Sequence, residues 1–131
     1  MSLSKEWNWS IVQDPMWLQP SEESYYLAQR WRDAGYRTFL DFGCGLGRHA
    51  IFFARKGFSV SAFDLSSDGV AHLHTWAAQE KLNIDTRVAD MLNLPYADNT
   101  FDCLLAYHVI SHTDTAGMRK VIAEIGRVLR P

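Results

Sequence analysis

Apolar and polar residues follow two alternating periods along most of the chain. Short apolar runs that suit buried strands occupy 37–42, 58–63, 84–88 and 101–108. Apolar residues at helical spacing predict helices over 21–34, 49–56, 66–80 and from 114 onward. Strands that alternate with helices in this way predict an α/β fold with a doubly wound parallel sheet and right-handed crossovers.

Local signals place the starts of the helices. Ser21, Ser66 and either Asp114 or Thr113 precede the predicted helices, and all are residue types that cap helix N-termini. The apolar positions of the last helix recur at helical spacing: Met118, Val121, Ile122, Ile125, Val128 and Leu129.

The first 20 residues show neither period. We therefore expect an irregular N-terminal segment over 1–20, followed by one domain over 21–131. The N-terminal segment contains Trp7, Trp9 and Trp17. These rings could form a lid over a bound ligand or pack against the sheet, and large apolar residues in a tail more often pack.

Three glycines alternate between the first strand and the next helix, in the run Gly43-Cys-Gly45-Leu-Gly47. Glycine adopts backbone angles that are closed to other residues, and it leaves room for a ligand. The start of the following helix offers unpaired N–H groups and a partial positive charge. Gly43, Gly45 and Gly47 are therefore predicted to cradle a small polar ligand.

Three cofactor classes bind at turns of this kind. A triphosphate loop needs a Lys-Ser/Thr pair after its last glycine, but Arg48 and His49 stand there. A dinucleotide loop reads Gly-x-Gly-x-x-Gly, and here Ala50 holds the third glycine position, which is sometimes allowed. The third class, an acidic residue followed by alternating glycines, is satisfied from Asp41 to Gly47. The pattern favours this third class and leaves a dinucleotide open.

Carboxylates follow the predicted strands. Asp64 ends the second strand and Asp90 follows the third. Because the carboxyl ends of parallel strands meet at one edge of a sheet, these side chains should lie near the glycine turn. Asp64 could accept hydrogen bonds from both hydroxyls of a ribose, a role that dinucleotide sites share. Asp41 could orient the amino end of a cofactor or bind local backbone N–H groups.

The order and spacing of these motifs over 38–131 resemble those of the class I S-adenosylmethionine-dependent methyltransferases. The resemblance extends beyond the glycine turn to the segments 88–91, 94–102 and 125–131, the last of which reads Ile-Gly-Arg-Val-Leu-Arg-Pro. It implies a Rossmann-like sheet of the methyltransferase type and S-adenosyl-L-methionine as the cofactor.

The resemblance also implies roles for individual residues. The glycine turn would contact the methionine part of the cofactor, with Asp41 near its amino end and Tyr107 passing alongside. Asp90 would accept a hydrogen bond from the adenine amino group, with Met91 beside the ring and Leu65 on its other face. The predicted cofactor-binding set is Asp41, Gly43, Gly45, Gly47, Asp64, Leu65, Asp90, Met91 and Tyr107.

The complete fold of that family has further strands after the fourth strand and its helix, where this chain ends. The resemblance therefore implies that the C-terminal strands are missing and that only the N-terminal part of the fold is present, with about four strands. The strand over 101–108 would then be an uncovered sheet edge, and exposed apolar edges invite pairing with another chain. We expect a homodimer that forms through this edge or through the last helix.

Composition and charge bear on the binding partners and on the cellular compartment. The net charge of −2 indicates no basic patch for nucleic acid and no polybasic membrane patch. No apolar run approaches the ~20 residues that span a bilayer, and the N-terminus lacks the apolar core of a secretion signal. Cys44 and Cys103 are expected to be reduced thiols, and we expect a cytoplasmic protein.

Histidines are the remaining candidates for chemistry. His108 and His112 could act as bases, but such residues more often orient a loop or cap a helix, so no catalytic residue is assigned. His72 and His74 are two residues apart in a predicted helix. They lack the i, i+4 spacing of a metal-binding pair, so no metal site is predicted.

Three functions follow from these observations. The favoured one is methyl transfer from S-adenosyl-L-methionine to a small-molecule acceptor, with this chain acting as the enzyme or as its cofactor-binding part. The first alternative is a non-catalytic module that binds the same cofactor as a partner or regulatory subunit. The second alternative is an NAD-dependent oxidoreductase.

Overall fold

The computed structural model describes residues 15–107, 109 and 113–131. Four parallel strands form one sheet in the order β3-β2-β1-β4, with β1 at Thr38–Phe42, β2 at Ser59–Asp64, β3 at Ile84–Val88 and β4 at Cys103–Leu105. The helices are α1 (Glu22–Asp33), α2 (Arg48–Arg55), α3 (Ser67–Gln79) and α4 (Thr115–Val128), and a short 3-10 helix, η2, spans Pro15–Leu18. The predicted α/β fold with a parallel sheet is confirmed.

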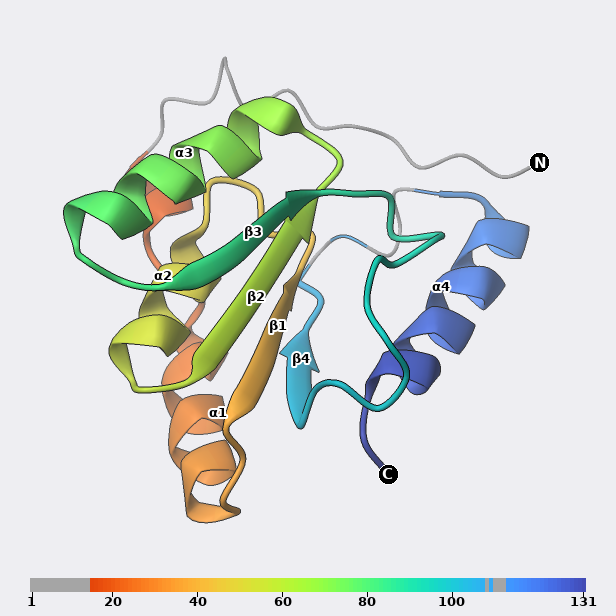
Figure 1. Ribbon diagram of the computed structural model, residues 1–131, viewed down its shortest axis with the longest axis horizontal. Coiled ribbons are helices and arrows are strands. Elements are labelled where there is room, and N and C mark those ends of the chain that lie inside the picture. The colour runs from red at the N-terminus through yellow and green to blue at the C-terminus, as the bar shows by residue number, and fades with distance from the viewer. Residues whose placement is uncertain (1–14, 108, 110–112) are drawn as a thin grey trace.

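The order of the strands reverses beside β1. The chain moves outward from β1 to β2 and β3, and then returns to place β4 on the other side of β1. In sheets of this topology, ligands bind outside the carboxyl ends of the strands next to the reversal. The residues that follow β1 and β4 therefore define where a site should lie (Figure 1).

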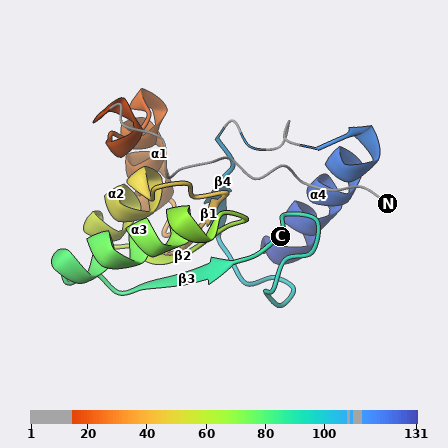
Figure 2. The same cartoon turned by 90° about the horizontal axis from the view of Figure 1, so that it is seen from above.

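Helices cover the two faces of the sheet unequally. α1, α2 and α3 lie on one face, and α4 lies alone on the other (Figure 1, Figure 2). The core under the three helices includes the stacked rings of Phe39 and Phe53, whose centroids are 4.0 Å apart. The opposite core joins Phe42 and Phe63 of the sheet to Val121 of α4. Phe39 and Phe42, three positions apart in β1, thus point into different layers, as the two-residue period of a strand requires.

Side chains cap two of the three predicted helix starts. The Oγ of Ser66 accepts the N–H of the residue three positions ahead at 3.2 Å, and the Oδ1 of Asp114 does the same at 2.7 Å. Ser21 precedes α1 as predicted but does not cap it, because its hydroxyl pairs with the hydroxyl of Ser24 at 2.8 Å.

The fourth strand is shorter than predicted. Only Cys103–Leu105 pairs with β1, while Phe101 forms a separate parallel bridge to Leu129. Between them, Asp102 turns its carboxylate to the start of β1, where Oδ2 accepts the N–H groups of residues 37 and 38 at 2.7 and 3.1 Å. Asp102 also donates its own N–H to the backbone oxygen of Thr38 at 3.1 Å. The pairing with β1 ends at Leu105, before the end that the apolar run predicted, and position 108 of that run lies outside the described residues.

The apolar positions predicted for the last helix are buried only in part. Val121 and Val128 are fully buried, and Ile125 packs against the same core. Ile122 is 61% exposed and Met118 38% exposed. Successive residues of a helix point about 100° apart. Since α4 meets the other described residues along one side only, the neighbours of the buried stripe face away from them.

Two further features complete the fold. Cys44 and Cys103 are both buried and form no disulfide. Within the described ranges, no helix combines the length and the apolar character that crossing a membrane requires.

Candidate functional site

The turn after β1 consists of alternating residues in the left-handed region. Gly43, Gly45 and Gly47 have φ angles of 73°, 56° and 103°. A Cβ on Gly43 would lie 2.4 Å from Cγ2 of Val109, and a Cβ on Gly47 would lie 2.5 Å from Cδ1 of Leu73. The backbone of the turn and its close packing therefore require glycine there before any ligand is considered. The structure brings the three predicted glycines to the carboxyl edge of the sheet.

Asp64 fastens this turn to the end of β2. Its Oδ2 accepts the N–H of Gly45 at 2.8 Å, and its Oδ1 accepts the N–H of Ser66 at 2.8 Å. The residue is 8% exposed. These two bonds hold the carboxylate at the strand end where the predicted ribose contact would form. The ribose contact itself stays a prediction.

Asp41 lies next to the same turn, and its side chain binds the protein backbone. Its Oδ2 accepts the N–H of Ala50 at 2.9 Å, so it pairs a donor in the first turn of α2. This is the local backbone role that the sequence left open. Burial raises the pKa of Asp41 to about 7; the bond from Ala50 opposes the shift, and the nearby charge of Asp64 adds to it.

Two buried carboxylates beside a helix start favour a cationic ligand over a phosphate. A pyrophosphate at this turn would be repelled by Asp41 and Asp64, and the N–H of Ala50 that could bind it already pairs with Asp41. A sulfonium or ammonium group would be attracted to the same carboxylates and would lower the pKa of Asp41. The electrostatics of the turn therefore suit S-adenosylmethionine better than a dinucleotide.

The segment after β3 carries two of the predicted residues. Asp90 is half-buried, and its Oδ1 accepts the N–H of Leu92 at 2.9 Å. Met91 is only 4% exposed and packs in the core on the α4 face of the sheet. Leu65, directly after β2, is half-buried. The predicted contacts of these three residues with adenine remain predictions.

An arginine links the N-terminal segment to the end of β4. The guanidinium of Arg48 lies 5.2 Å from the ring centroid of Trp17 and 5.3 Å from that of Tyr107, and it donates to the backbone oxygen of Gln19 at 3.2 Å. Cation–π contacts on two rings hold the three side chains together. Tyr107 thus lies at the predicted edge. Of the three tryptophans considered for a lid, Trp17 reaches this edge, while Trp7 and Trp9 lie outside the described residues.

His49 makes a second contact near this segment, with Ser21 at the start of α1. Its Nε2 accepts the backbone N–H of Ser21 at 3.1 Å, which places the imidazole proton on Nδ1. Burial, and then the charge of Arg48, lower the pKa of His49 to about 4. The imidazole is therefore neutral at neutral pH and serves as an acceptor.

The sequence used Arg48 and His49 only to argue against a triphosphate. Their position in the first turn of the helix after the glycines could have marked them as residues near the site, because that turn faces the candidate site. The two histidines considered as bases, His108 and His112, lie outside the described residues, so the structure assigns no catalytic base.

Comparison with known proteins agrees with this geometry. A family model described as a methyltransferase domain matches residues 39–131. Methyltransferase GfsG from Streptomyces halstedii is 33% identical over 103 residues, which cover 75% of this chain and 35% of that protein. Norajmaline N-methyltransferase from Rauvolfia serpentina is 34% identical over 102 residues, which cover 72% of this chain and 33% of that protein. The chain spans about a third of the length of these relatives.

A solved structure extends the match to three dimensions. It belongs to a protein from Methanococcus maripaludis that has been provisionally assigned as an S-adenosyl-L-methionine-dependent methyltransferase. The TM-score is 0.72 at 25% identity, and the match covers 82% of this chain and 49% of the other.

Proposed function

The chain belongs to the class I S-adenosylmethionine-dependent methyltransferases, and we propose that it forms the cofactor-binding part of an enzyme that methylates a small molecule. The cofactor of this family is S-adenosyl-L-methionine, which supplies an activated methyl group. The observation that carries the proposal is the glycine turn closed by Asp64. It brings the alternating glycines and two buried carboxylates together at one sheet edge.

The residues present suit that cofactor. The left-handed glycines add no side chain of their own to the turn, while Asp41 and Asp64 supply the negative charge that a sulfonium and an ammonium group would meet. Arg48 and His49 join the start of α2, next to the turn, to Gln19 and Ser21. Methyl transfer mainly requires an acceptor atom held close and in line. These residues would bind and orient the cofactor for such an approach.

A small-molecule acceptor is supported by one relative whose name states its substrate, norajmaline. That name describes the relative, and it guides the choice of acceptors for this chain. A panel of hydroxyl and amine acceptors tests the proposal. Binding of cofactor without transfer to any acceptor would instead favour the non-catalytic module.

Calorimetry with S-adenosylhomocysteine, S-adenosylmethionine and NADH tests the cofactor. We expect the two sulfur compounds to bind and NADH to bind more weakly. Asp64→Asn should weaken S-adenosylhomocysteine about 10-fold or more, because a charge-assisted acceptor is removed. Asp68→Asn, which removes an exposed carboxylate of α3, is the matched control and should bind like the wild type. Tighter binding of NADH, or no binding of either sulfur compound by folded protein, would contradict the proposal.

We further propose a cytoplasmic homodimer. Two features of the described residues support the dimer: β4 pairs only with β1 within the sheet, and Ile122 on α4 is 61% exposed. Light scattering over a range of concentrations should show a dimer, and Ile122→Glu should shift it toward monomer if α4 forms the contact. A monomer at every concentration would contradict the dimer without affecting the cofactor site.

A further inference from the structure

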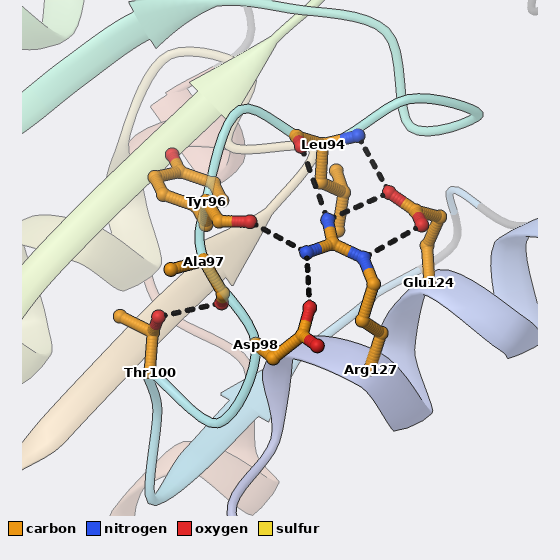
Figure 3. Close-up of polar contacts among 7 residues, drawn as sticks. All are labelled: Leu94, Tyr96, Ala97, Asp98, Thr100, Glu124 and Arg127. Carbon is orange, nitrogen blue, oxygen red and sulfur yellow. Dashed lines mark hydrogen bonds and ion pairs between the residues drawn. The ribbon is translucent and has the colours of Figure 1, made fainter.

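Arg127 of α4 uses every N–H of its guanidinium. Nε and one Nη donate to the two carboxylate oxygens of Glu124 at 2.9 and 3.0 Å. The same Nη donates to the backbone oxygen of Leu94 at 3.1 Å. The other Nη donates to the backbone oxygen of Tyr96 at 2.7 Å and to Oδ1 of Asp98 at 3.0 Å. Figure 3 shows these bonds converging from α4 on the segment that follows β3.

Glu124 completes the hold on this segment. Its Oε2 accepts the backbone N–H of Leu94 at 2.8 Å (Figure 3). Leu94 is thus held at both its N–H and its oxygen by two side chains one turn apart on α4. Both side chains are largely shielded, since Arg127 is 31% and Glu124 16% exposed. A bidentate arginine–carboxylate pair that also binds backbone groups fixes direction as well as distance.

The held position is four residues from Asp90, a predicted adenine-binding residue. Between them the chain forms a tight turn, in which Asp90 Oδ1 accepts the N–H of Leu92 at 2.9 Å and the Asp90 backbone oxygen accepts the N–H of Asn93 at 3.0 Å. The side chains of Met91, Leu92 and Leu94 are all buried. Residues 90–94 therefore form one packed unit, and Arg127 and Glu124 anchor its C-terminal end.

We propose that Arg127 and Glu124 are positioning residues for the adenosine side of the cofactor site, acting through the turn at 90–94. This proposal rests on the proposed function and adds to it a device on α4, remote in sequence from the glycine turn. Neither side chain needs to touch the cofactor. Their role is to hold the carboxylate of Asp90 in one position and orientation, so that the side chain is already ordered before the cofactor binds.

The geometry demands arginine at position 127. Lysine has three donors on one nitrogen and cannot reach Leu94, Tyr96, Asp98 and Glu124 together. Arg127→Lys keeps the charge and most of the buried stem, so it removes the directional bonds with little other change. Arg130→Lys is the matched control, because Arg130 is also paired with a carboxylate, that of Asp102, and binds the backbone oxygen of Asn99 outside the 90–94 turn.

A double-mutant cycle tests the proposal through dissociation constants for S-adenosylhomocysteine, measured with Arg127→Lys, Asp90→Asn and the double variant. We expect Arg127→Lys to weaken binding about 5-fold or more, and Arg130→Lys to stay within about 2-fold of the wild type. Asp90→Asn should lose much less affinity in the Arg127→Lys background than in the wild type, because the carboxylate there is already misplaced. Amide hydrogen exchange at Leu92 and Asn93 should accelerate in Arg127→Lys and stay unchanged in Arg130→Lys.

The outcomes distinguish the positioning role from the cofactor binding on which it rests. If wild-type protein binds and the two substitutions act additively, the positioning role is overturned while the cofactor site stands. Unchanged amide exchange at Leu92 and Asn93 in Arg127→Lys also overturns the positioning role. Failure of folded wild-type protein to bind S-adenosylhomocysteine overturns the function and the positioning role together.

Discussion

The two faces of the sheet are held by different kinds of contact. Under α1, α2 and α3, aromatic rings pack closely: Phe53 lies within 4.0 to 5.7 Å, centroid to centroid, of Phe39, Phe52, Phe58 and Trp31. Under α4, the apolar core is joined by a directional polar network centred on Arg127. The same face exposes Ile122 and buries the hydroxyl of Tyr96 without a hydrogen-bond partner among the described residues.

The difference separates stability from positioning. Apolar contacts are strong in sum but tolerate small shifts, since they have no preferred direction. Hydrogen bonds to backbone atoms contribute less net free energy but fix orientation. The three-helix face should therefore dominate the free energy of unfolding, while the α4 face should govern the shape of the cofactor edge.

The largest expected effect is on the aromatic core. Phe53→Ala should lower the free energy of unfolding by about 3–5 kcal/mol, because a fully buried ring is replaced by a cavity. Phe101→Ala is the matched change on the α4 face and should lower it by nearer to about 3 kcal/mol. The ring of Phe101 contacts that of Tyr96, at a centroid distance of 5.1 Å, whereas Phe53 contacts four rings. Denaturant unfolding measures both. Equal losses would mean that the two faces are packed alike.

The polar tie within the three-helix face should be sensitive to acid. The pKa of His49 is lowered from 6.5 to about 4, so the neutral imidazole is favoured in the folded state. The stability it contributes is present above the unfolded-state pKa and is lost as the pH falls from 6.5 toward 4. Unfolding measured at acid and neutral pH should show that His49→Gln, which keeps an acceptor for Ser21, reduces the acid loss by about 2 kcal/mol.

His74→Gln on the exposed side of α3 is the control for that measurement. An equal loss of unfolding free energy at acid pH in His49→Gln and in the wild type would show that protonation of His49 is not coupled to unfolding.

Removing one hydroxyl group from the α4 face should raise the stability of the protein. Burial raises the pKa of Tyr96, and its hydroxyl lacks a partner in the described chain. Tyr96→Phe removes that unpaired group and keeps the ring, so it should raise the free energy of unfolding by about 1 kcal/mol. Thermal unfolding measures the change. A loss of stability instead would reveal a partner for the hydroxyl and would remove one contrast between the faces.

The smallest effect should come from the outer ion pair of the three-helix face. Arg55 and Glu80 pair on the surface, with side chains 50% and 29% exposed. Glu80→Gln should cost about 0.2–1 kcal/mol and less at high salt, because exposed pairs are screened. Chemical denaturation at two salt concentrations checks this. A cost well above about 1 kcal/mol, or one that does not change with salt, would contradict the view that this pair is exposed and screened.

Several predictions from the sequence are confirmed because they rest on local physics. The helix caps at Ser66 and Asp114 depend on residues three positions apart, and the glycine turn depends on backbone angles that glycine alone adopts readily. The strand over 84–88 and the strand-to-helix alternation follow from periodicity. The family is also shown, because its motifs are linear and occupy one stretch of chain.

The errors arise where partners come from distant parts of the chain. The apolar run 101–108 predicted a long strand, but Phe101 bridges to Leu129, Asp102 binds backbone groups 64 and 65 residues away, and only Cys103–Leu105 pairs with β1. Met118 and Ile122 fit a helical stripe, yet the side of α4 on which they lie meets no other described element closely enough to bury them. Periodicity reports which residues share a face, and it does not report how much of that face will be covered.

The amino-acid sequence by itself determined the order of strands and helices, the left-handed glycine turn and the family to which the chain belongs, because each depends on near neighbours or on linear motifs. Only the tertiary structure decided what the acidic residues do within the protein and how the turn at 90–94 is held. Asp41 meets Ala50, Asp64 meets Gly45, and Arg127 meets Leu94 across 33 residues. Such hydrogen bonds exist only after the sheet and α4 have brought their partners within reach, because their strength depends on distance and angle in space.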